Sequence, residues 1–425
     1  MPLVVQKYGG TVLRDPSDRR LAVTEIQRAR EAGIDVVVVV SAMGRAPDPY
    51  ATDTLLDLAR ETCMVDPLLD GTLARNLDIL LSAGEVAAAG LIALHLCSAG
   101  IPAVAVTAAR AGLITSSEFG RARILRIEPA ELLDALRQGR TPVVAGFQGV
   151  TEAGELTTLG RGGSDTTAVA LGAALDADLV EIVKDVEGVM TADPALVGSA
   201  SLLEVLSHDD LIALSGMGSR VVQPRAVELG RLHEVPIRVR KLGHKGGTYV
   251  MPGKLAFEIN GDLSAVALAH QDGIALLSLS TDSDGVASLR RLLGVPDLAG
   301  RLQCLAMTAA GATACLREED LPAVTQQVRA HPTLRVEVRP HCAMVSIVGP
   351  AGSAASELMA AALTDLESVR VPVLHAQGSQ GVSVVVDSAD LRRALSQLHT
   401  MLRLDARPAT ADPLPSWAHA DRLVG

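Results

Sequence analysis

A lysine and two glycines near the start of the chain have the residue types and the spacing needed to hold a phosphate group. Lys7, Gly9 and Gly10 come just after a short apolar run at residues 3–5. Glycines after a strand let consecutive backbone N–H groups face an anion, and the lysine adds a positive charge beside them. A tight strand-to-helix turn next to a surface lysine accounts for this motif equally well.

A second glycine-rich segment, at residues 146–175, carries a more specific pattern. Arg161 stands among three glycines, and Ser164 with Asp165 then opens an Ala-rich stretch in the manner of a helix cap. An arginine held at a helix N-terminus is suited to bidentate capture of a small carboxylate. A cap alone would explain Ser164 or Asp165 but would leave Arg161 and the glycines unexplained.

A third polar segment, at residues 183–194, places Lys184 and Asp185 at the end of a predicted strand. An ordinary hairpin is an equally good interpretation of this segment taken alone. Neither a Walker A loop nor a protein-kinase G-x-G-x-x-G followed by H-R-D occurs in the sequence. These two classes of phosphoryl-transfer enzyme are therefore excluded.

The polar segments need a scaffold that brings several strand ends together. Continuous apolar runs at residues 3–5, 36–40 and 143–145 alternate with helix-period segments, the first of them at 17–32. Continuous hydrophobicity is typical of strands covered by helices on both faces. We expect an α/β layered domain with a mostly parallel central sheet over residues 1–250, and a ligand site beyond the carboxyl ends of its strands.

Beyond residue 250 the elements become shorter. Two small α+β units, at about 260–335 and 336–407, account for their order, and a loose tail is expected at 408–425. Strands are predicted at 274–279, 304–308, 313–316, 342–348, 371–375 and 382–386, and helices at 286–293, 321–330, 354–363 and 389–402.

Composition excludes further classes of function. Aromatic residues make up 2% of the chain and the formal net charge is -11, which argues against nucleic acid as a partner. The five cysteines and ten histidines lack metal-binding spacings, and the cysteines suggest a reducing cytoplasm. The N-terminus does not resemble a signal peptide. The most apolar region, 86–106, contains Gly100 and Pro102 and predicts a buried helix leading into a strand, so no membrane partner is expected.

Seven segments resemble, in order, the pattern of aspartate kinases of the amino acid kinase family. They are KYGGT (7–11), VVVSAMG (38–44), PYATDTLL (49–56), LSAGE (81–85), LTTLGRGGSDTTAVALGAAL (156–175), DVEGVMTADP (185–194) and VPIRVR (235–240). The resemblance covers essentially all of the first 250 residues. The C-terminal half is similar to the paired ACT domains of that family through its element order and through runs at 345–352 and 371–387.

The resemblance implies ATP-dependent phosphorylation of the β-carboxylate of L-aspartate to 4-phospho-L-aspartate. This would be the first step of the aspartate-derived pathway to lysine, threonine, methionine and diaminopimelate. A carboxylate nucleophile is already ionised at pH 7 and needs no general base, so catalysis reduces to positioning and charge neutralisation. Mg²⁺ would arrive with ATP rather than in a protein cage.

The resemblance also assigns roles to individual residues. Lys7 and the amides of Gly9 and Gly10 would stabilise the transferring phosphoryl group. Asp165 would orient the substrate amine or the catalytic lysine. The aspartate site would be lined by Ser41, Thr52, Glu85, Arg161 and Ser164, with Glu85 facing the α-ammonium and Arg161 a carboxylate. The nucleotide would lie along Lys184, Asp185 and Arg220.

Regulation and assembly follow from the ACT-like half. The resemblance implies a homodimer formed through these domains and an inhibitory amino acid, such as lysine, threonine or a related product, at their interface. Gln377, Ser379 and Gln380 lie in the stretch expected to contact that effector. A polar turn between two strands is an equally good interpretation of these three residues.

Four positions depart from the family pattern. Val12 replaces a serine, Lys184 a threonine or serine, Ala195 an arginine and Arg220 a lysine. Lys184 could supply the charge absent at Ala195. These departures leave open a second hypothesis, a non-catalytic or weakly catalytic regulatory protein that binds an amino acid. Another amino acid kinase, acting on glutamate or an N-acetylated relative, is the alternative among enzymes. An acetylated substrate has no ammonium group for Glu85 to face, and the ACT-like half also favours an aspartate kinase.

Overall fold

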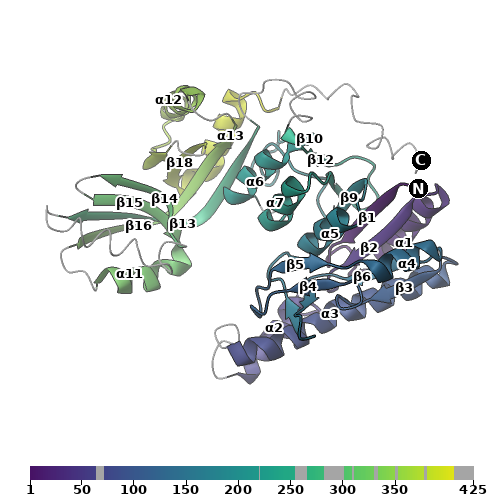
Figure 1. Cartoon of the computed structure of the whole chain (residues 1–425). Coiled ribbons are helices and arrows are strands. Elements are labelled where there is room, and N and C mark those ends of the chain that lie inside the picture. Colours follow the sequence, from purple (N-terminus) through teal and green to yellow (C-terminus); the bar gives the residue numbers. More distant parts are fainter. Residues whose placement is uncertain are drawn as a thin grey trace.

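The chain folds into an N-terminal α/β part and a C-terminal part built on an antiparallel sheet (Figure 1). The computed structural model describes residues 1–63, 71–219, 221–253, 266–281, 301–308, 311–329, 334–349, 353–377 and 381–405. The predicted helix at 286–293 and tail at 408–425 lie outside the described residues, as do Arg220, Ser379 and Gln380.

The central sheet of the described N-terminal part has eight strands in the order β10-β12-β11-β9-β1-β2-β6-β3. They are β1 (Leu3–Tyr8), β2 (Asp35–Val40), β3 (Ala103–Val106), β6 (Thr141–Ala145), β9 (Leu179–Lys184), β10 (Val205–Ser207), β11 (Ile237–Lys241) and β12 (Thr248–Met251). Every pairing is parallel except that of β11 with β12. The expected mostly parallel sheet is confirmed.

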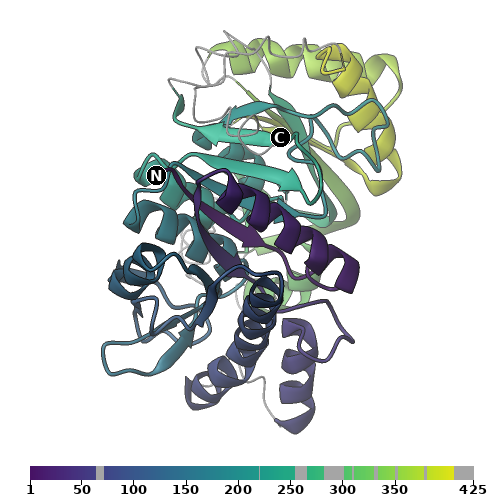
Figure 2. The ribbon, with the colours of Figure 1, turned by 90° about the vertical axis from the view of Figure 1, so that its right-hand side faces the viewer.

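Helices cover both faces of this sheet, which is why its strands are continuously apolar. On one face, α1 (Pro16–Glu31) and α3 (Gly71–Ser98) pack on Val36, Val38 and Val40, whereas Val37 and Val39 face the helix α5 (Gly163–Ala174) on the other side. Figures 1 and 2 show α1 and α3 on their common face. The second face is completed by α4 (Ala130–Arg137), α6 (His208–Gly216) and α7 (Pro224–Leu232).

The helix α3 is long and apolar enough to cross a membrane, but half of its most apolar window is buried inside the protein. It is followed by β3, which confirms the predicted helix leading into a strand, although the helix is buried on one face only and Val86 and Leu94 are exposed. Beside its N-terminal part lie α2 (Thr52–Thr62) and a small sheet in the order β5-β4-β7-β8. The strands of that sheet are β4 (Leu113–Thr115), β5 (Ile124–Ile127), β7 (Gln148–Val150) and β8 (Leu156–Thr158).

The C-terminal sheet has the order β14-β15-β13-β16-β18-β17 among the described residues, and its pairings are antiparallel. Its strands are β13 (Ala267–Thr281), β14 (Gln303–Thr308), β15 (Gly311–Arg317), β16 (Leu334–Val348), β17 (His375–Gln377) and β18 (Val382–Asp387). Its helices are α11 (Leu321–Arg329), α12 (Ser353–Ser368) and α13 (Leu391–Met401), with short 3-10 turns η2 (Glu318–Asp320) and η3 (Ser388–Asp390).

Two features of this sheet differ from the sequence prediction. The expected division between residues 335 and 336 falls inside β16, because β13 and β16 pair along both halves of the sheet. The first half of β16 was not predicted as a strand, because residues 335–341 are exposed and do not form an apolar run. The predicted strand at 371–375 was wrong, since β17 begins only at His375; Val371 is apolar because it packs in the core, not because it lies in a strand.

Candidate active site

The carboxyl ends of four neighbouring strands meet at one edge of the central sheet. Tyr8 of β1 lies beside Val40 of β2 and Val183 of β9, and Val40 lies beside Ala145 of β6. Residues that close these strands or directly follow them therefore come together although they are far apart in the sequence. They include Lys7, Gly9, Gly10, Ser41 and Lys184.

A buried carboxylate between two lysines forms the centre of this edge. The Lys7 Nζ lies 2.7 Å from Asp165 Oδ1, and the Lys184 Nζ lies 2.9 Å from Asp165 Oδ2. The side chains of Lys7 and Asp165 are only 7% and 4% exposed, and that of Lys184 is 19% exposed. Lys184 also donates to the Val221 carbonyl oxygen. The strand ends of β1 and β9 thus hold two ammonium groups on one carboxylate at the start of α5.

The two lysines keep Asp165 ionised. Burial by itself raises the pKa of this carboxyl, but the charges and hydrogen bonds of Lys7 and Lys184 outweigh burial and lower the pKa to about 2. The pKa of Lys7 is lowered by burial and by the positive charge of Lys184, against the opposing effect of Asp165. The cluster carries a net positive charge and is therefore suited to binding an anion beside it.

A left-handed glycine sets the start of α5. Gly162 is the N-cap residue with φ 71°, and a Cβ there would lie 1.7 Å from the Cγ of Gln223, so both the backbone conformation and the close approach require glycine. Ser164 and Asp165 lie in the first turn and do not cap the helix, so the cap interpretation was wrong. Both are buried, whereas Arg161 is exposed in the preceding loop.

Glu85 lies on the inner face of α3 and is 2% exposed. Its Oε1 accepts a hydrogen bond from the Ala42 N–H at 3.0 Å, and no hydrogen-bond partner of Oε2 is found within the described ranges. Burial raises the pKa of Glu85 to about 8, although the Ala42 bond and the charge of Lys7 oppose the shift. A buried carboxyl with one unpaired oxygen is suited to binding a cationic group.

The first glycine motif is tightly packed against its neighbours. The Gly9 N–H, expected to bind the phosphoryl group, donates to the Val183 carbonyl oxygen at 3.1 Å in this structure. A Cβ on Gly10 would lie 2.1 Å from the Ala42 carbonyl oxygen, so only glycine allows this approach of the loops after β1 and β2. Val12 is 3% exposed and packs in the core rather than facing the site.

The remaining predicted residues lie outside the Lys7–Asp165–Lys184 cluster. Ser41 is half-buried after β2, and Thr52 is half-buried at the first position of α2. Asp185 is exposed, with Oδ2 4.0 Å from the guanidinium of Arg45. The backbone carbonyl of Ala195 accepts from Arg392 of α13 at 3.1 Å, so the structure shows this position in contact with the C-terminal part. Gln377 is half-buried in β17.

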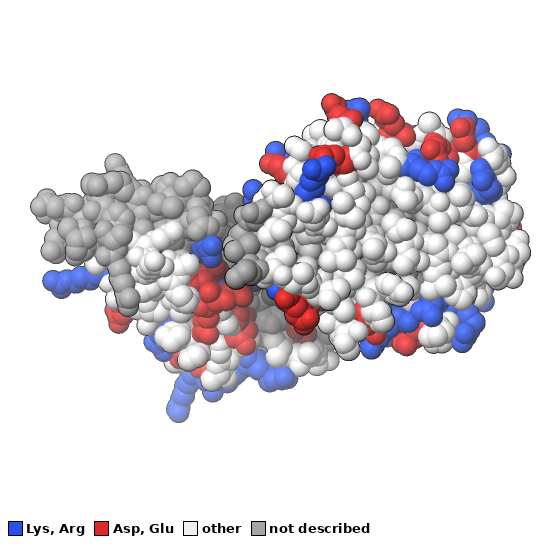
Figure 3. All heavy atoms as spheres, turned by 90° about the horizontal axis from the view of Figure 1, so that it is seen from below, with Lys and Arg blue, Asp and Glu red and all other residues white. Residues whose placement is uncertain are grey.

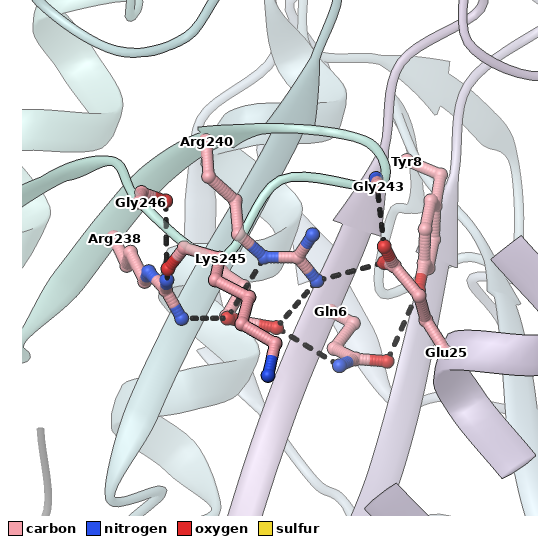
Figure 4. A network of polar contacts seen from close by, with 9 residues as sticks. Gln6, Tyr8, Glu25, Arg238, Arg240, Gly243, Lys245 and Gly246 are labelled. Atoms are coloured by element: carbon pink, nitrogen blue, oxygen red, sulfur yellow. Dashed lines mark hydrogen bonds and ion pairs between the residues drawn. The ribbon is translucent and has the colours of Figure 1, made fainter. Parts of the chain in front are cut away.

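A buried polar network that sequence analysis missed joins the strands that carry the two lysines (Figure 4). Glu181 of β9 accepts from Arg240 at 3.0 and 3.1 Å, from Arg238 at 3.2 Å and from Gln6 at 2.9 Å. Burial alone would raise the pKa of Glu181, but Arg240 and Arg238 lower it to about 2. The presence of charged residues inside otherwise apolar strands could have indicated this network from the sequence.

The same network fixes the loop after β11. Arg240 also pairs with Glu25 of α1 at 2.9 Å, Glu25 accepts from the Gly243 N–H at 2.8 Å, and Arg238 donates to the carbonyl oxygens of Lys245 and Gly246. Beside this loop lies a cavity of about 160 Å³. Because β1, β9 and β11 are bound to one another in this way, the positions of Lys7 and Lys184 at their ends are fixed as well.

Comparison with known proteins gives a consistent result. Residues 2–241 match the amino acid kinase family. Aspartokinase 1 of Bacillus subtilis is 46% identical over 241 residues, which are 56% of this chain and 58% of that protein. An aspartokinase of Thermus thermophilus is 35% identical over 420 residues, which are 95% of this chain and 100% of that protein. The chain therefore matches somewhat more than half of the first relative and the whole of the second.

Solved structures show the same fold. Escherichia coli aspartokinase III in complex with aspartate and ADP has a TM-score of 0.75 at 22% identity, covering 94% of this chain and 100% of that chain. Aspartate kinase from Synechocystis has a TM-score of 0.52 at 30% identity, covering 97% of this chain and 71% of that chain. The expected combination of a layered α/β domain with an ACT-like C-terminal part is confirmed.

Proposed function

This chain belongs to the amino acid kinase family, within its aspartokinases, and we propose that it transfers the γ-phosphoryl group of ATP to the β-carboxylate of L-aspartate. The observation that carries this proposal is the buried Lys7–Asp165–Lys184 cluster at the sheet edge. The full-length match to the Thermus thermophilus aspartokinase supports it. Both disfavour the alternative of a non-catalytic regulator, because such a protein would have no need of two lysines on one buried carboxylate.

The proposed chemistry requires charge neutralisation rather than proton transfer. A β-carboxylate oxygen forms the new bond to the γ-phosphorus while the bond to the ADP oxygen breaks, and no proton has to move. Lys7 and Lys184 neutralise negative charge on the phosphoryl oxygens, and Asp165 holds both ammonium groups in place. Preorganised charges of this kind act strongly because the site is largely closed to water.

The aspartate site lies on the α3 side of the cluster in this proposal. Glu85 Oε2, which has no hydrogen-bond partner in the described part of the chain, binds the substrate α-ammonium. The positive charge of this group lowers the raised pKa of Glu85, so that the residue ionises. Arg161 pairs with a substrate carboxylate from the loop before α5. Ser41, Thr52 and Ser164 complete the lining, while Gly9, Gly10, Asp185 and Arg220 lie along the nucleotide.

Mg²⁺ enters with the nucleotide. Within the described residues no group of three or more His, Cys, Asp or Glu side chains could hold a metal ion. Asp165 is already paired with two lysines, so the donor set fits a Mg²⁺ ion held mainly by phosphate oxygens and water. When bound, the ion would neutralise charge on the phosphates. The pathway position described above and a cytoplasmic location belong to the same proposal.

The direct test measures ADP release from ATP and Mg²⁺ with L-aspartate, L-glutamate or N-acetylglutamate, and traps the acyl phosphate with hydroxylamine. We expect hydroxamate only with aspartate. Turnover that prefers N-acetylglutamate would overturn the assignment of Glu85 to an ammonium group. No turnover with any of the three substrates would favour the alternative hypothesis of a non-catalytic regulatory protein.

Feedback inhibition is the second part of the proposal, and contacts between the two parts of the chain support it. Segment 189–202, which follows the strand of Lys184, packs on the C-terminal part. The Thr191 Oγ1 lies 2.9 Å from His399 Nε2 of α13, and the Thr191 carbonyl accepts from the Leu268 N–H of β13 at 2.7 Å. A shift of α13 would therefore be transmitted to the end of β9. The effector is an amino acid such as lysine or threonine.

A homodimer through the ACT-like part is supported by an edge of β16 that pairs with no strand among the described residues. Residues 335–341 are exposed, and β18 pairs with β16 only from Cys342 onward. An unpaired strand edge readily accepts a strand from another chain. Replacing Val338, which is 36% exposed, by proline should lower the mass of the assembly in solution. An unchanged mass would exclude this edge as the dimer contact.

A further inference from the structure

The helix α3 carries a second buried carboxylate, which the proposed chemistry does not use. Asp78 is 0% exposed and lies on the same inner face of α3 as Glu85, roughly 10 Å away along the helix axis. Figure 3 shows the protein from below, where α3 lies, and the Asp and Glu side chains of the N-terminal part appear mainly at the margins of this face. Asp78 and Glu85 are instead directed into the protein.

Both oxygens of Asp78 accept hydrogen bonds from segments that are distant in the chain. Oδ2 accepts from the Thr158 N–H at 2.8 Å and from the Gly120 N–H at 3.0 Å. Oδ1 accepts from the Thr158 hydroxyl at 2.7 Å and lies 3.1 Å from the Gly120 nitrogen. Burial raises the pKa of Asp78, and the bonds from Thr158 and Gly120 oppose this shift. One side chain of α3 therefore holds both the end of β8 and the loop between β4 and β5.

The segments that Asp78 holds lead directly to Arg161. Thr158 ends β8, and Arg161 lies in the loop that follows this strand. A Cβ on Gly160 would lie 3.1 Å from the Gly120 carbonyl oxygen, so the loop of Gly120 packs closely on the loop of Arg161. The position of Arg161 relative to α3 therefore depends on Asp78.

Arg225 of α7 binds the same two loops. Its Nη1 donates to the Ala122 carbonyl oxygen at 3.1 Å and to the Leu159 carbonyl oxygen at 3.3 Å. The Ala122 N–H in turn donates to the Thr158 carbonyl oxygen at 2.9 Å. The loops are thus attached to α3 through Asp78 and to α7 through Arg225, and a hydrogen-bonded network of this kind restricts their movement.

We propose that Asp78 is a positioning residue, which fixes the distance between Glu85 and Arg161 so that both can bind one molecule of aspartate. This inference rests on the proposed function, in which Glu85 binds the substrate ammonium and Arg161 a substrate carboxylate. A carboxylate suits the role because its two oxygens accept from both segments at once. An amide of the same size has only one accepting oxygen.

The test measures the dissociation constant of L-aspartate by calorimetry, and KM for aspartate and for ATP by hydroxamate formation. Asp78→Asn keeps the size of the side chain but turns an N–H donor toward the N–H groups of Thr158 and Gly120. We expect the dissociation constant of aspartate to rise about tenfold through misplacement of Arg161, while KM for ATP changes less than about twofold. Thr158→Val removes only the hydroxyl donor, and we expect a rise of about threefold.

A double variant separates positioning from a general loss of structure. If Asp78 acts through Arg161, adding Asp78→Asn to Arg161→Ala should change the dissociation constant by less than about twofold, because the group that Asp78 positions is already absent. Asp210→Asn is the matched control and should keep wild-type affinity. Asp210 of α6 also accepts from the N–H and hydroxyl of one residue, Ser207, at 3.3 and 2.6 Å, but it has no contact with the loop of Arg161.

Two results would overturn the proposal. One is wild-type affinity for aspartate in Asp78→Asn. The other is an equal loss of affinity in the wild-type and Arg161→Ala backgrounds, which would make Asp78 a residue of the fold alone. Protein that binds aspartate but forms no hydroxamate would contradict the kinase activity, and the affinities would still decide the role of Asp78. Urea unfolding shows whether each variant is folded, and Thr158→Val provides the same comparison if Asp78→Asn is not.

Discussion

Lys184→Met tests the central claim, that two lysines share the Asp165 carboxylate and neutralise the transferring phosphoryl group. Lys184 is 19% exposed and Asp165 4% exposed, with 2.9 Å between Nζ and Oδ2. Removing one partner of a buried charge pair costs about 3–5 kcal/mol when the other charge is left unpaired. Asp165 would retain Lys7 at 2.7 Å, so we expect a smaller loss, about 2 kcal/mol, or a roughly 30-fold decrease of kcat/KM for ATP.

The assay is hydroxamate formation at saturating aspartate with varied ATP. Lys184→Arg keeps the positive charge and should recover most of the lost activity, whereas Lys184→Thr introduces the residue type usual in the family and should behave like the methionine variant. Lys241→Met is the matched control, because Lys241 ends β11 directly beside Lys184 but lies on the strand away from Asp165. Urea unfolding of each variant separates a loss of catalysis from a loss of stability.

The reasoning fails if Lys184→Met retains wild-type kcat/KM for ATP. It fails in a different way if the methionine and arginine variants lose the same activity, since the charge would then be irrelevant and only the shape of the side chain would matter. A tenfold or larger rise of KM for aspartate with unchanged kinetics for ATP would place Lys184 in the aspartate site instead.

Three further predictions concern Glu85, Arg161 and the contact between Thr191 and His399. Burial raises the pKa of Glu85 from 4.5 to about 8, so the stability that its proton contributes is complete below pH 4.5 and is lost as the pH rises to 8. Glu85→Gln should remove this decline of the free energy of unfolding, measured in urea. It should also remove the fall of KM for aspartate that we expect between pH 6 and 8. Arg161→Ala should raise the dissociation constant of aspartate roughly 30-fold, equivalent to about 2 kcal/mol, and an unchanged value in calorimetry would remove Arg161 from the site. His399→Leu breaks the contact with Thr191 and should abolish inhibition by lysine or threonine, while basal kcat/KM changes less than about threefold. Retained inhibition would show that the contact between α13 and Thr191 does not transmit the effect.

Much of the N-terminal fold follows from local sequence patterns. The valine run of β2 predicts a strand buried on both faces, and the segment before it predicts α1, because covered parallel strands and amphipathic helices leave different periodicities. The ends of these elements predict a ligand site, because parallel strands that begin together also end together. The apolar stretch after residue 86 was likewise correctly assigned to a helix followed by a strand.

The C-terminal sheet was less predictable. β16 begins with exposed, polar residues that pair with β13 only because the two strands lie together in the folded chain. Val371 is buried outside any strand, so its apolar character misled the assignment. Pairing with the distant strand β13 decided the start of β16, and packing in the C-terminal core decided the burial of Val371. A local pattern carries no record of such distant neighbours.

The sequence by itself determined the types of group available to the site: the lysine before the first glycines, the arginine and aspartate around the second, and the glutamate in the long apolar helix. Only the tertiary structure decided how they are used. It placed Lys184 on Asp165 and directed the Gly9 N–H to a neighbouring strand. It also left one oxygen of Glu85 without a partner among the described residues and turned the other side of that helix outward. The reason is physical, because charge pairing and burial depend on distances between residues that are far apart in the chain, as Lys7 and Asp165 are.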